Sequence, residues 1–231
     1  MHLVLLPGMD GTGFLFEPLL AHLPKGVSAE VVAYPGDVPL TYAELLPIVK
    51  AAMPSGVPYL LLGESFSGPL ALMAAAERPN GLQGVILCAS FIRNPIRYIP
   101  QWAAIFSGGF LFRFAPHFLT FKALLSGYSS SELRGLMAQA HSAVLPGVMA
   151  MRARNILGVN VENELRKLEQ PILYLRGSSD MVVPKRSLRQ ILRIHPETRV
   201  AIIPGPHLVL QVNPKESLDA IVAFAGSHGA F

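Results

Sequence analysis

The sequence predicts an α/β fold, an open and mostly parallel sheet of about six strands with helices on both faces. Short apolar runs bounded by glycine or proline alternate along the chain with longer amphipathic stretches. The apolar runs are rich in valine, isoleucine and leucine and show no polar alternation, which is typical of parallel strands covered on both faces. The regular succession of strand and helix therefore favours one parallel sheet with its connecting helices on either side.

The apolar runs are predicted to be strands and the amphipathic stretches to be helices. We expect strands at His2–Leu6, Ala29–Tyr34, Tyr59–Gly63, Gly84–Ala89, Ile172–Arg176 and Arg199–Ile203. We expect helices near Gly13–His22, Tyr42–Ala52, Phe66–Arg78, Pro184–Ile194 and Pro214–Ala225. Pro184 and Pro214 each suit the first turn of a helix, where a backbone N–H has no intrahelical partner.

The alternation stops at about residue 91 and resumes at about residue 171. The intervening stretch holds helical and loop patterns but no convincing strand, and about 80 residues is too long for a loop within a compact domain. We therefore expect a helical cap insertion at residues 91–170, placed over one edge of the sheet. Residues 1–90 and 171–231 are expected to form the core.

The composition argues against a disordered chain and against a nucleic-acid-binding protein. Hydrophobic residues make up 51% of the chain and charged residues 15%, which leaves ample apolar surface for a core. The net charge is +4, and the basic residues are scattered. Their densest group, Lys185 to Arg193, is spaced along one face of a helix, which is typical of a solvated surface rather than of a site for DNA or RNA.

The sequence favours a cytoplasmic protein without a membrane span. The single cysteine, Cys88, cannot form an internal disulfide and therefore suits a reducing compartment. Met1 and His2 lead directly into a short apolar run, so we expect no signal peptide. The uncharged segment Tyr98–Phe112 is shorter than the roughly 20 residues of a spanning helix, so it is expected to touch a lipid surface at most.

The most informative stretch is Gly63–Ser67, where a predicted strand ends at a serine and a helix begins at once. This is the pattern of a nucleophile elbow, a strained turn that lifts the serine hydroxyl clear of the sheet. The flanking backbone comes so close that only small residues fit two positions away, and Gly63 and Ser67 are small. Ser65 is therefore the predicted nucleophile, and the N–H of Phe66 is a predicted oxyanion donor. The alternative is a serine that only caps the helix.

A serine nucleophile needs a general base, and the base needs a carboxylate that orients it. Asp180 lies in the turn after the strand predicted at Ile172–Arg176, at the edge where open α/β sheets assemble their sites. His207 follows the last predicted strand, in a loop rich in glycine and proline. The chain order Ser65, Asp180, His207 is that of one fold, so we predict Asp180 as the acid and His207 as the base. A turn aspartate and an ordinary loop histidine are the alternatives.

The first predicted strand runs into the glycine-rich turn Pro7–Gly13. The turn lacks the Lys-Ser/Thr pair of a phosphate-binding loop, and Asp37 is a weak match for a ribose ligand, so we expect no nucleotide cofactor. No other cofactor and no metal is expected either. A second oxyanion donor fits the turn better, and we predict the backbone N–H of Met9. A glycine-rich turn without chemistry is the alternative.

On these residues the chain resembles the α/β-hydrolase superfamily over essentially its whole length. The resemblance rests on Gly63–Ser67, Asp180, His207 and the sequence Pro7–Met9 after the first strand. Within the superfamily the chain is similar to small lidded esterases of the pimeloyl-carrier-protein methyl ester esterase type, which carry a cap where the insertion is expected. The resemblance implies a serine carboxylesterase with a Ser-His-Asp triad and an acyl-Ser65 intermediate. It disfavours the branches of the superfamily that use an aspartate nucleophile.

The sequence departs from that family's pattern at three places. Pro7-Gly8 stands where many relatives have His-Gly, and Ser67 stands where a glycine is commoner. The chain also starts at what would be the family's third strand, so one edge of the sheet is expected to be exposed. Such an edge can pair with another subunit, which leaves an oligomer as an open expectation.

The aromatic residues of the insertion include five that recur at every fourth position, namely Trp102, Phe106, Phe110, Phe114 and Phe118. They either pack the cap onto the core or line an apolar acyl pocket, and both interpretations stay open. The pocket predicts a small-molecule ester with an apolar acyl or alkyl chain as the substrate. A thioesterase or an acyltransferase on the same triad is an alternative. A non-hydrolytic receptor of the same fold is another alternative. The complete triad argues against it, because a protein that only binds a ligand does not need all three residues.

Overall fold

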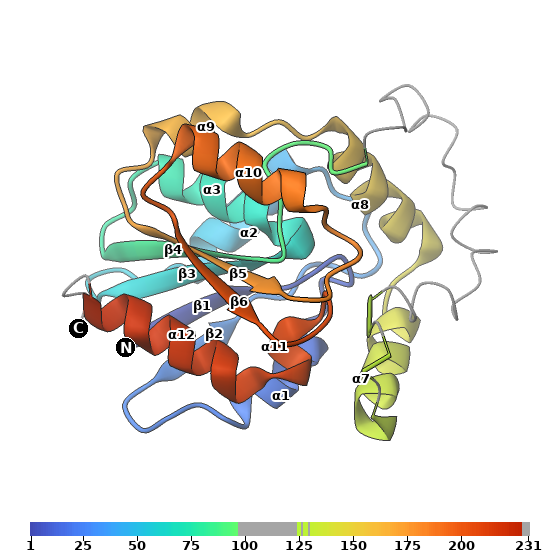
Figure 1. Cartoon of the computed structure of the whole chain (residues 1–231). Helices are drawn as coiled ribbons and strands as arrows, with labels where there is room; N and C mark the ends of the chain where they lie inside the picture. The colour runs from blue at the N-terminus through green and yellow to red at the C-terminus, as the bar shows by residue number, and fades with distance from the viewer. Residues whose placement is uncertain (97–123, 126, 129, 228–231) are drawn as a thin grey trace.

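The computed structural model describes residues 1–96, 124–125, 127–128 and 130–227 and shows a sheet enclosed by helices (Figure 1). In these residues the strands form one six-stranded sheet in the order β2-β1-β3-β4-β5-β6, and all neighbours are parallel. The strands are β1 His2–Leu6, β2 Ser28–Val31, β3 Tyr59–Glu64, β4 Leu82–Cys88, β5 Ile172–Gly177 and β6 Arg199–Ile203. The predicted open parallel sheet is confirmed.

The helices lie on both faces of the sheet, as the sequence predicts (Figure 1). One face is covered by α2 (Tyr42–Ala52), α3 (Gly68–Ala76), α9 (Glu162–Lys167) and α10 (Lys185–Ile194). The other face is covered by the turn η1 (Phe14–Phe16) and by α1 (Glu17–Leu20), α11 (Val209–Val212) and α12 (Pro214–Ser227). Within the described ranges, no helix has both the length and the apolar character that a membrane span requires.

The side chains of the central strands alternate between two cores, one on each face of the sheet. In β3, Leu61 belongs to the core beneath α2 and α3, whereas Leu60 and Leu62 belong to the core beneath α12. All six residues of β3 are buried. Because each face of the strand meets apolar helix residues, the strand reads as a continuous apolar run without polar alternation.

Among the predicted elements, two differ from the structure for local reasons that the contacts show. The strand predicted at Ala29–Tyr34 is β2 Ser28–Val31 in the structure, because this edge strand pairs with β1 alone and its last hydrogen bond to β1 is that of the Val32 N–H with the carbonyl oxygen of Leu5. The helix predicted near Gly13–His22 is a 3-10 turn followed by a short α-helix. Gly13 has a φ of 78°, so the chain enters this segment through a left-handed residue rather than through a regular helical start.

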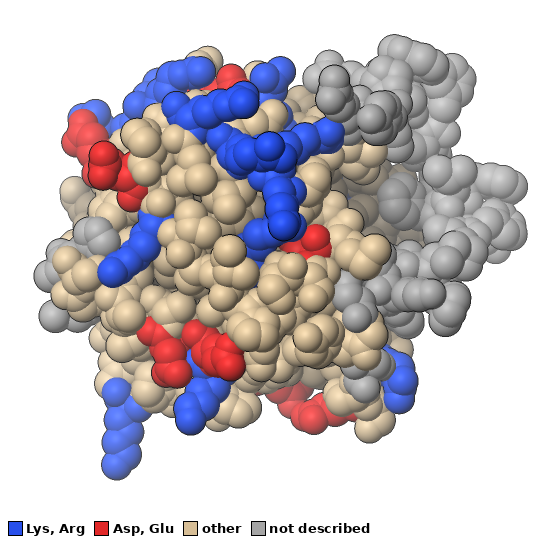
Figure 2. All heavy atoms as spheres, viewed as in Figure 1, with Lys and Arg blue, Asp and Glu red and all other residues tan. Residues whose placement is uncertain are grey.

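The basic residues of α10 form the outer face of an amphipathic helix. Lys185, Arg189 and Arg193 are exposed, while Ser187 and Ile191 are buried on the opposite face. Figure 2 shows Lys and Arg side chains gathered over this part of the surface. The spacing of these charges in the sequence predicts this solvated face, and the structure confirms it.

The described part of residues 91–170 contains α7 (Ser131–Ser142), α8 (Pro146–Gly158) and α9. Helices α7 and α8 both lie at the same end of the sheet (Figure 1). Leu136 of α7 packs in one apolar cluster with Leu208, which follows β6. In contrast, α9 packs against α3 and contributes to the core on that face of the sheet. A cap with the boundaries 91–170 stays a prediction.

Candidate active site

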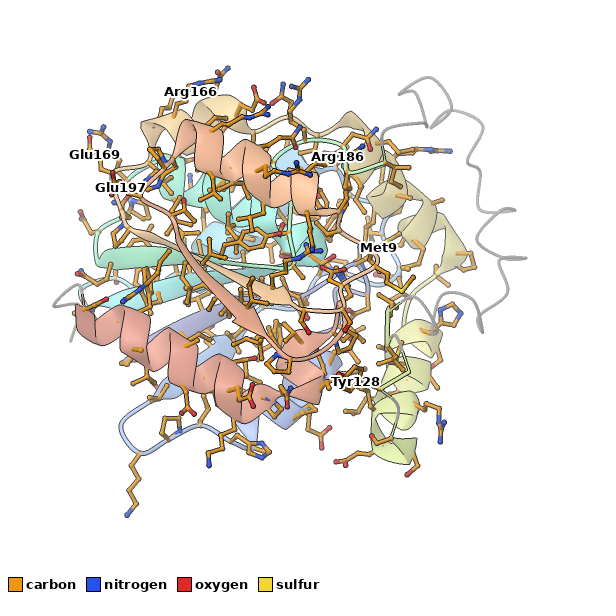
Figure 3. All side chains as sticks on the ribbon, viewed as in Figure 1. Met9, Tyr128, Arg166, Glu169, Arg186 and Glu197 are labelled. Carbon is orange, nitrogen blue, oxygen red and sulfur yellow. The ribbon has the colours of Figure 1, made fainter. Side chains whose placement is uncertain are left out.

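The loops that follow β1, β3, β5 and β6 meet at one edge of the sheet. All strands are parallel, so their carboxyl ends lie at the same edge and the residues after them come together. Ser65 follows β3, Asp180 follows β5, and His207 follows β6. Met9 lies in the loop after β1, and Figure 3 labels it at this edge. Four segments that are far apart in the sequence are thus brought to one place.

Ser65 has a strained backbone conformation between β3 and α3, with a φ of 46°. The strain is held by close contact between the strand and the helix. A Cβ on Gly63 would lie 2.6 Å from the carbonyl oxygen of Ser67, and a Cβ on Gly68 would lie 1.8 Å from the hydroxyl oxygen of Ser90. The need for a small residue at position 63 follows from the predicted elbow. The need for glycine at position 68 arises from Ser90, which follows β4 and meets the helix only in the fold.

Ser65, His207 and Asp180 form a continuous hydrogen-bonded line. The Nε2 of His207 lies 2.9 Å from the Oγ of Ser65, and its Nδ1 lies 3.1 Å from the Oδ1 of Asp180. The network assigns the tautomer in which Nδ1–H donates to Asp180 and Nε2 accepts a hydrogen bond from the hydroxyl of Ser65. His207 is 3% exposed, so its ring is held away from bulk water. This geometry fits a nucleophile, a general base and an orienting carboxylate.

The carboxylate of Asp180 is held in the ionised state. Its Oδ1 accepts hydrogen bonds from the N–H groups of Val182 at 2.8 Å and Val183 at 3.0 Å. Burial alone would raise the pKa of Asp180, but the hydrogen bond and charge of His207 and the two N–H groups together lower it below its ordinary value. An ionised Asp180 can therefore stabilise a protonated His207.

Arg176 holds the turn that carries Asp180, a role that no sequence motif predicts. It is 4% exposed near the end of β5. Its Nη1 donates to the carbonyl oxygen of Val183 at 2.8 Å, and its Nη2 donates to that of Asp180 at 3.1 Å. Nη1 also lies 3.9 Å from the Oδ2 of Asp180, an oxygen without a hydrogen-bond partner in the described residues. The only signal in the sequence is one charge near the end of an apolar run.

The two predicted oxyanion donors are backbone N–H groups in the elbow and in the loop after β1. The N–H groups of Met9 and Phe66 have no hydrogen-bond partner in the part of the chain that the structure describes. Phe66 lies in the 3-10 turn η2 (Ser65–Ser67), at a helix start, where N–H groups have no intrahelical partner. Both groups are therefore available to an oxygen that carries negative charge, although their role stays a prediction.

Hydrogen bonds tie the elbow to its surroundings. The hydroxyl of Ser67 donates to the carbonyl oxygen of Pro7 and accepts from the hydroxyl of Tyr34 at 2.8 Å. The hydroxyl of Tyr42 donates to the carbonyl oxygen of Phe66 at 2.8 Å, and the two rings stack with centroids 4.7 Å apart. Ser67 is thus more than a small residue in the place of glycine, because it joins the elbow to the loop after β1.

Glu64 is a buried carboxyl group directly before the nucleophile. It is 2% exposed, and its Oε1 accepts a hydrogen bond from the Nε2 of Gln211 in α11 at 2.9 Å. Burial raises the pKa of Glu64 to about 7, with a further contribution from Asp10, while Gln211 and His207 oppose the rise. The sequence motif treats this position as variable, so neither the burial nor the partner is visible in it.

The aromatic residues predicted to line a pocket are Trp102, Phe106, Phe110, Phe114 and Phe118, and they lie outside the described residues. The apolar acyl pocket therefore stays a prediction.

Residues 42–208 match the serine aminopeptidase S33 family of hydrolases. The chain belongs to this family. It is 27% identical over 236 residues to the biotin biosynthesis bifunctional protein BioHC of Cellvibrio japonicus. This alignment covers 96% of this chain but 47% of that protein. The chain thus spans less than half the length of this relative. It is also 26% identical over 226 residues to a pimeloyl-acyl-carrier-protein methyl ester esterase of Xylella fastidiosa, which covers 87% of this chain and 84% of that enzyme.

Solved structures agree with this family assignment at the level of the fold. The bromoperoxidase of Bacillus anthracis superposes with a TM-score of 0.83 at 16% identity, over 97% of this chain and 91% of that one. Such a likeness establishes the α/β-hydrolase fold, and the predicted resemblance to this superfamily is confirmed. Together, the family match and the shared fold identify an α/β hydrolase.

Proposed function

We propose that this family member is a serine carboxylesterase that cleaves esters with an apolar acyl or alkyl chain through an acyl-Ser65 intermediate. The observation that carries the proposal is the hydrogen-bonded line from Ser65 through His207 to Asp180, at 2.9 Å and 3.1 Å. The three groups lie in the order and at the distances that acyl transfer needs.

In the first half of the reaction, the Nε2 of His207 takes the proton of Ser65 as its Oγ attacks the ester carbonyl carbon. Asp180 stabilises the resulting imidazolium. The N–H groups of Met9 and Phe66 are the proposed donors to the oxyanion of the tetrahedral intermediate. His207 then gives its proton to the leaving alcohol as the C–O bond breaks, which leaves acyl-Ser65.

In the second half, His207 takes a proton from a water molecule, and the hydroxide attacks the acyl carbon. The second tetrahedral intermediate collapses, the bond to Ser65 breaks, and His207 returns the proton to Oγ. The carboxylic acid leaves and the free enzyme is restored.

The names of the relatives support an ester as the substrate. Two of them, from Xylella fastidiosa and Edwardsiella ictaluri, are named as methyl ester esterases. An apolar chain would occupy a pocket lined by the aromatic residues of the proposed cap at residues 91–170, which include Trp102 and Phe106. The family's description names an aminopeptidase, so cleavage of an amino-terminal amide bond is the second candidate.

We further propose that the enzyme acts in the cytoplasm as a small-molecule esterase. The single cysteine, which is buried, is compatible with a reducing compartment. An oligomer, which the sequence leaves open, would pair through β2, one of the two edge strands of the described sheet, although a strand of four residues offers few unpaired backbone groups.

The test is hydrolysis of p-nitrophenyl esters of increasing acyl length beside aminoacyl p-nitroanilides. We expect ester cleavage that rises with acyl length, and a loss of several orders of magnitude in kcat in Ser65→Ala. The exposed Ser55 provides a matched control, since Ser55→Ala should keep the wild-type rate. Turnover of the anilides alone would favour the aminopeptidase. A folded wild-type protein that cleaves neither, and whose Ser65 does not react with a fluorophosphonate, would contradict a serine hydrolase.

A further inference from the structure

Arg152 is a buried arginine in α8, and among the described residues all its hydrogen bonds go to backbone carbonyl groups. It is 1% exposed, and its Nη1 donates to the carbonyl oxygen of Met9 at 3.0 Å and to that of Asp10. Its Nη2 donates to the carbonyl oxygen of Pro35 at 2.9 Å. These carbonyl groups belong to the loops after β1 and β2. A single side chain of residues 91–170 thus joins two loops at the carboxyl edge of the sheet.

The loop after β1 is shaped around this guanidinium group. Gly11 has a φ of 69°, and a Cβ there would lie 2.5 Å from the Nη1 of Arg152. The N–H of Gly11 donates to the carbonyl oxygen of Gly8 at 3.0 Å, which closes a tight turn. Only a glycine permits both the left-handed conformation and the close approach of the cation. The glycine-rich pattern of this loop therefore has a steric explanation.

Among the described residues, neighbouring groups balance the charge of the guanidinium, and none of them forms a direct ion pair with it. The carboxylate of Asp10 accepts hydrogen bonds from the N–H of Thr12 at 2.9 Å and from its hydroxyl at 2.6 Å. The same carboxylate and the ring of Tyr34, whose centroid is 5.9 Å from the Cζ of Arg152, attract the buried charge. With its contacts on carbonyl oxygens and almost no exposed surface, Arg152 is unsuited to bind the charged group of a substrate.

Helix α8 is itself anchored, so Arg152 is held in place. The N–H of Leu145, just before the helix, donates to the carbonyl oxygen of Gly36 at 2.8 Å. Near the other end, the side chain of Asn155 donates to the carbonyl oxygen of Leu40 at 3.0 Å. Both acceptors lie in the segment after β2. The guanidinium therefore projects from a helix that is fixed on both sides of it.

Met9 has one backbone donor and one acceptor. Its carbonyl oxygen is bound by Arg152, whereas its N–H has no partner in the described residues. On the other side of the loop, the hydroxyl of Ser67 binds the carbonyl oxygen of Pro7. The peptide groups around Met9 are thus fixed from two sides, by the elbow and by α8, and the donor that remains is the one that an oxyanion needs.

We propose that Arg152 is a positioning residue, which holds the loop after β1 so that the N–H of Met9 is available to the oxyanion. This inference rests on the proposed esterase mechanism and deepens it, because it makes a catalytic donor dependent on a side chain of α8. Arg152 acts through the loop and does not touch the substrate. Its loss should therefore lower kcat and leave KM nearly unchanged.

The test compares Arg152→Lys and Arg152→Ala with the wild type on one p-nitrophenyl ester. Loss of one oxyanion donor lowers kcat by roughly 100-fold or more, so a displaced donor should cost roughly 10- to 100-fold, with KM within about threefold. Lysine keeps the charge but lacks the fork that reaches three carbonyl groups, so we expect it to rescue little. Affinity for an apolar trifluoromethyl ketone, whose adduct with Ser65 carries an oxyanion, should fall by the same factor as kcat.

Two further measurements separate a positioning role from a merely structural one. Millimolar ethylguanidinium should restore part of kcat in Arg152→Ala, because it can occupy the site that the side chain leaves. Arg189→Ala is the matched control, because Arg189 is exposed on α10 and its loss should keep the wild-type kcat. If Arg152→Ala unfolds, Arg152→Lys and its ketone affinity still decide the question.

The inference is overturned if both Arg152 variants keep the wild-type kcat and ketone affinity, or if KM alone changes. Those outcomes presuppose an active wild type. If the wild type itself neither cleaves esters nor reacts with a fluorophosphonate at Ser65, the proposed esterase function has failed instead. The activity of the wild type thus distinguishes a failure of the proposed function from a failure of the positioning role of Arg152.

Discussion

The side chain of Gln211 donates a 2.9 Å hydrogen bond to the carboxyl group of Glu64, which joins the residue before the proposed nucleophile to α11, the helix that follows His207. Glu64 is almost fully buried, and burial raises its pKa to about 7. A buried carboxyl group of this kind links the stability of the site to pH in the physiological range.

The sign of this linkage follows from the raised pKa of Glu64. In the unfolded chain, the pKa of this glutamate has its ordinary value of 4.5. Between pH 4.5 and pH 7, the native protein therefore holds a proton on Glu64 that the unfolded chain has lost. The contribution of Glu64 to the free energy of unfolding therefore falls as pH rises through this window, by on the order of 3 kcal/mol. Glu64→Gln, which stays neutral and can still accept from Gln211, should remove this fall.

Urea unfolding at several values between pH 4.5 and pH 8 measures the effect. We expect Glu64→Gln to be more stable than the wild type above pH 7 and similar to it near pH 4.5. Glu197→Gln, at an exposed position, should follow the wild-type pH dependence. Parallel curves for the wild type and Glu64→Gln would contradict a titration of Glu64 in this range.

Asp180→Asn should reduce kcat by about 1,000- to 10,000-fold while the protein stays folded. The amide oxygen can still accept from the N–H groups of Val182 and Val183, but the negative charge that stabilises a protonated His207 is lost. Steady-state kinetics on a p-nitrophenyl ester measure the change, with Asp219→Asn as an exposed control. A loss of less than tenfold would remove Asp180 from the proposed triad.

Arg176→Met should lower the free energy of unfolding by about 2–4 kcal/mol, because it deprives the carbonyl oxygens of Val183 and Asp180 of charged donors in a buried place. The turn that carries Asp180 loosens, so kcat should fall as well. Chemical denaturation and ester kinetics measure both effects. The matched control is Arg193→Met on the exposed face of α10, which should stay within about 0.5 kcal/mol of the wild type. Equal stability of the two variants would show that Arg176 does not hold the turn.

Gly63→Ala should destabilise the protein by about 3 kcal/mol and abolish most of the activity. Its Cβ would lie 2.6 Å from the carbonyl oxygen of Ser67 and 2.9 Å from the Cα of Gly68, so the strand or the helix must shift. Gly135→Ala is the opposite case, because nothing lies within 4 Å of the added Cβ inside α7. That substitution should stabilise the protein by about 0.5–1 kcal/mol. Thermal unfolding of the two variants tests the contrast, and a tolerated alanine at position 63 would contradict the close contact.

The features that sequence reasoning anticipates share a physical cause. Continuous apolar runs predict strands buried on both faces, and parallel strands place all their carboxyl ends at one edge. A serine, an aspartate and a histidine that each follow such a strand are therefore brought close together whatever the details of packing. For this reason the sequence alone predicts that the loops of Ser65, Asp180 and His207 meet, without the distances between them.

The supporting contacts could not be anticipated in this way. Arg152 and Arg176 bind backbone carbonyl oxygens, which every residue carries, so no partner is marked in the sequence. Glu64 occupies a variable position of its motif, and its burial depends on α11 packing across the sheet edge. The early end of β2 likewise depends on its place at the edge, where it has one neighbour instead of two.

The sequence therefore carries the order of the elements, the parallel sheet and the residues after each strand, because periodicity and backbone conformation are local properties. The environment of those residues is determined only by the tertiary structure. Which charges are buried, which carbonyl groups they bind and what pKa a carboxyl group adopts depend on atoms from distant segments. Their proximity exists only after the strands have paired and the helices have packed over them.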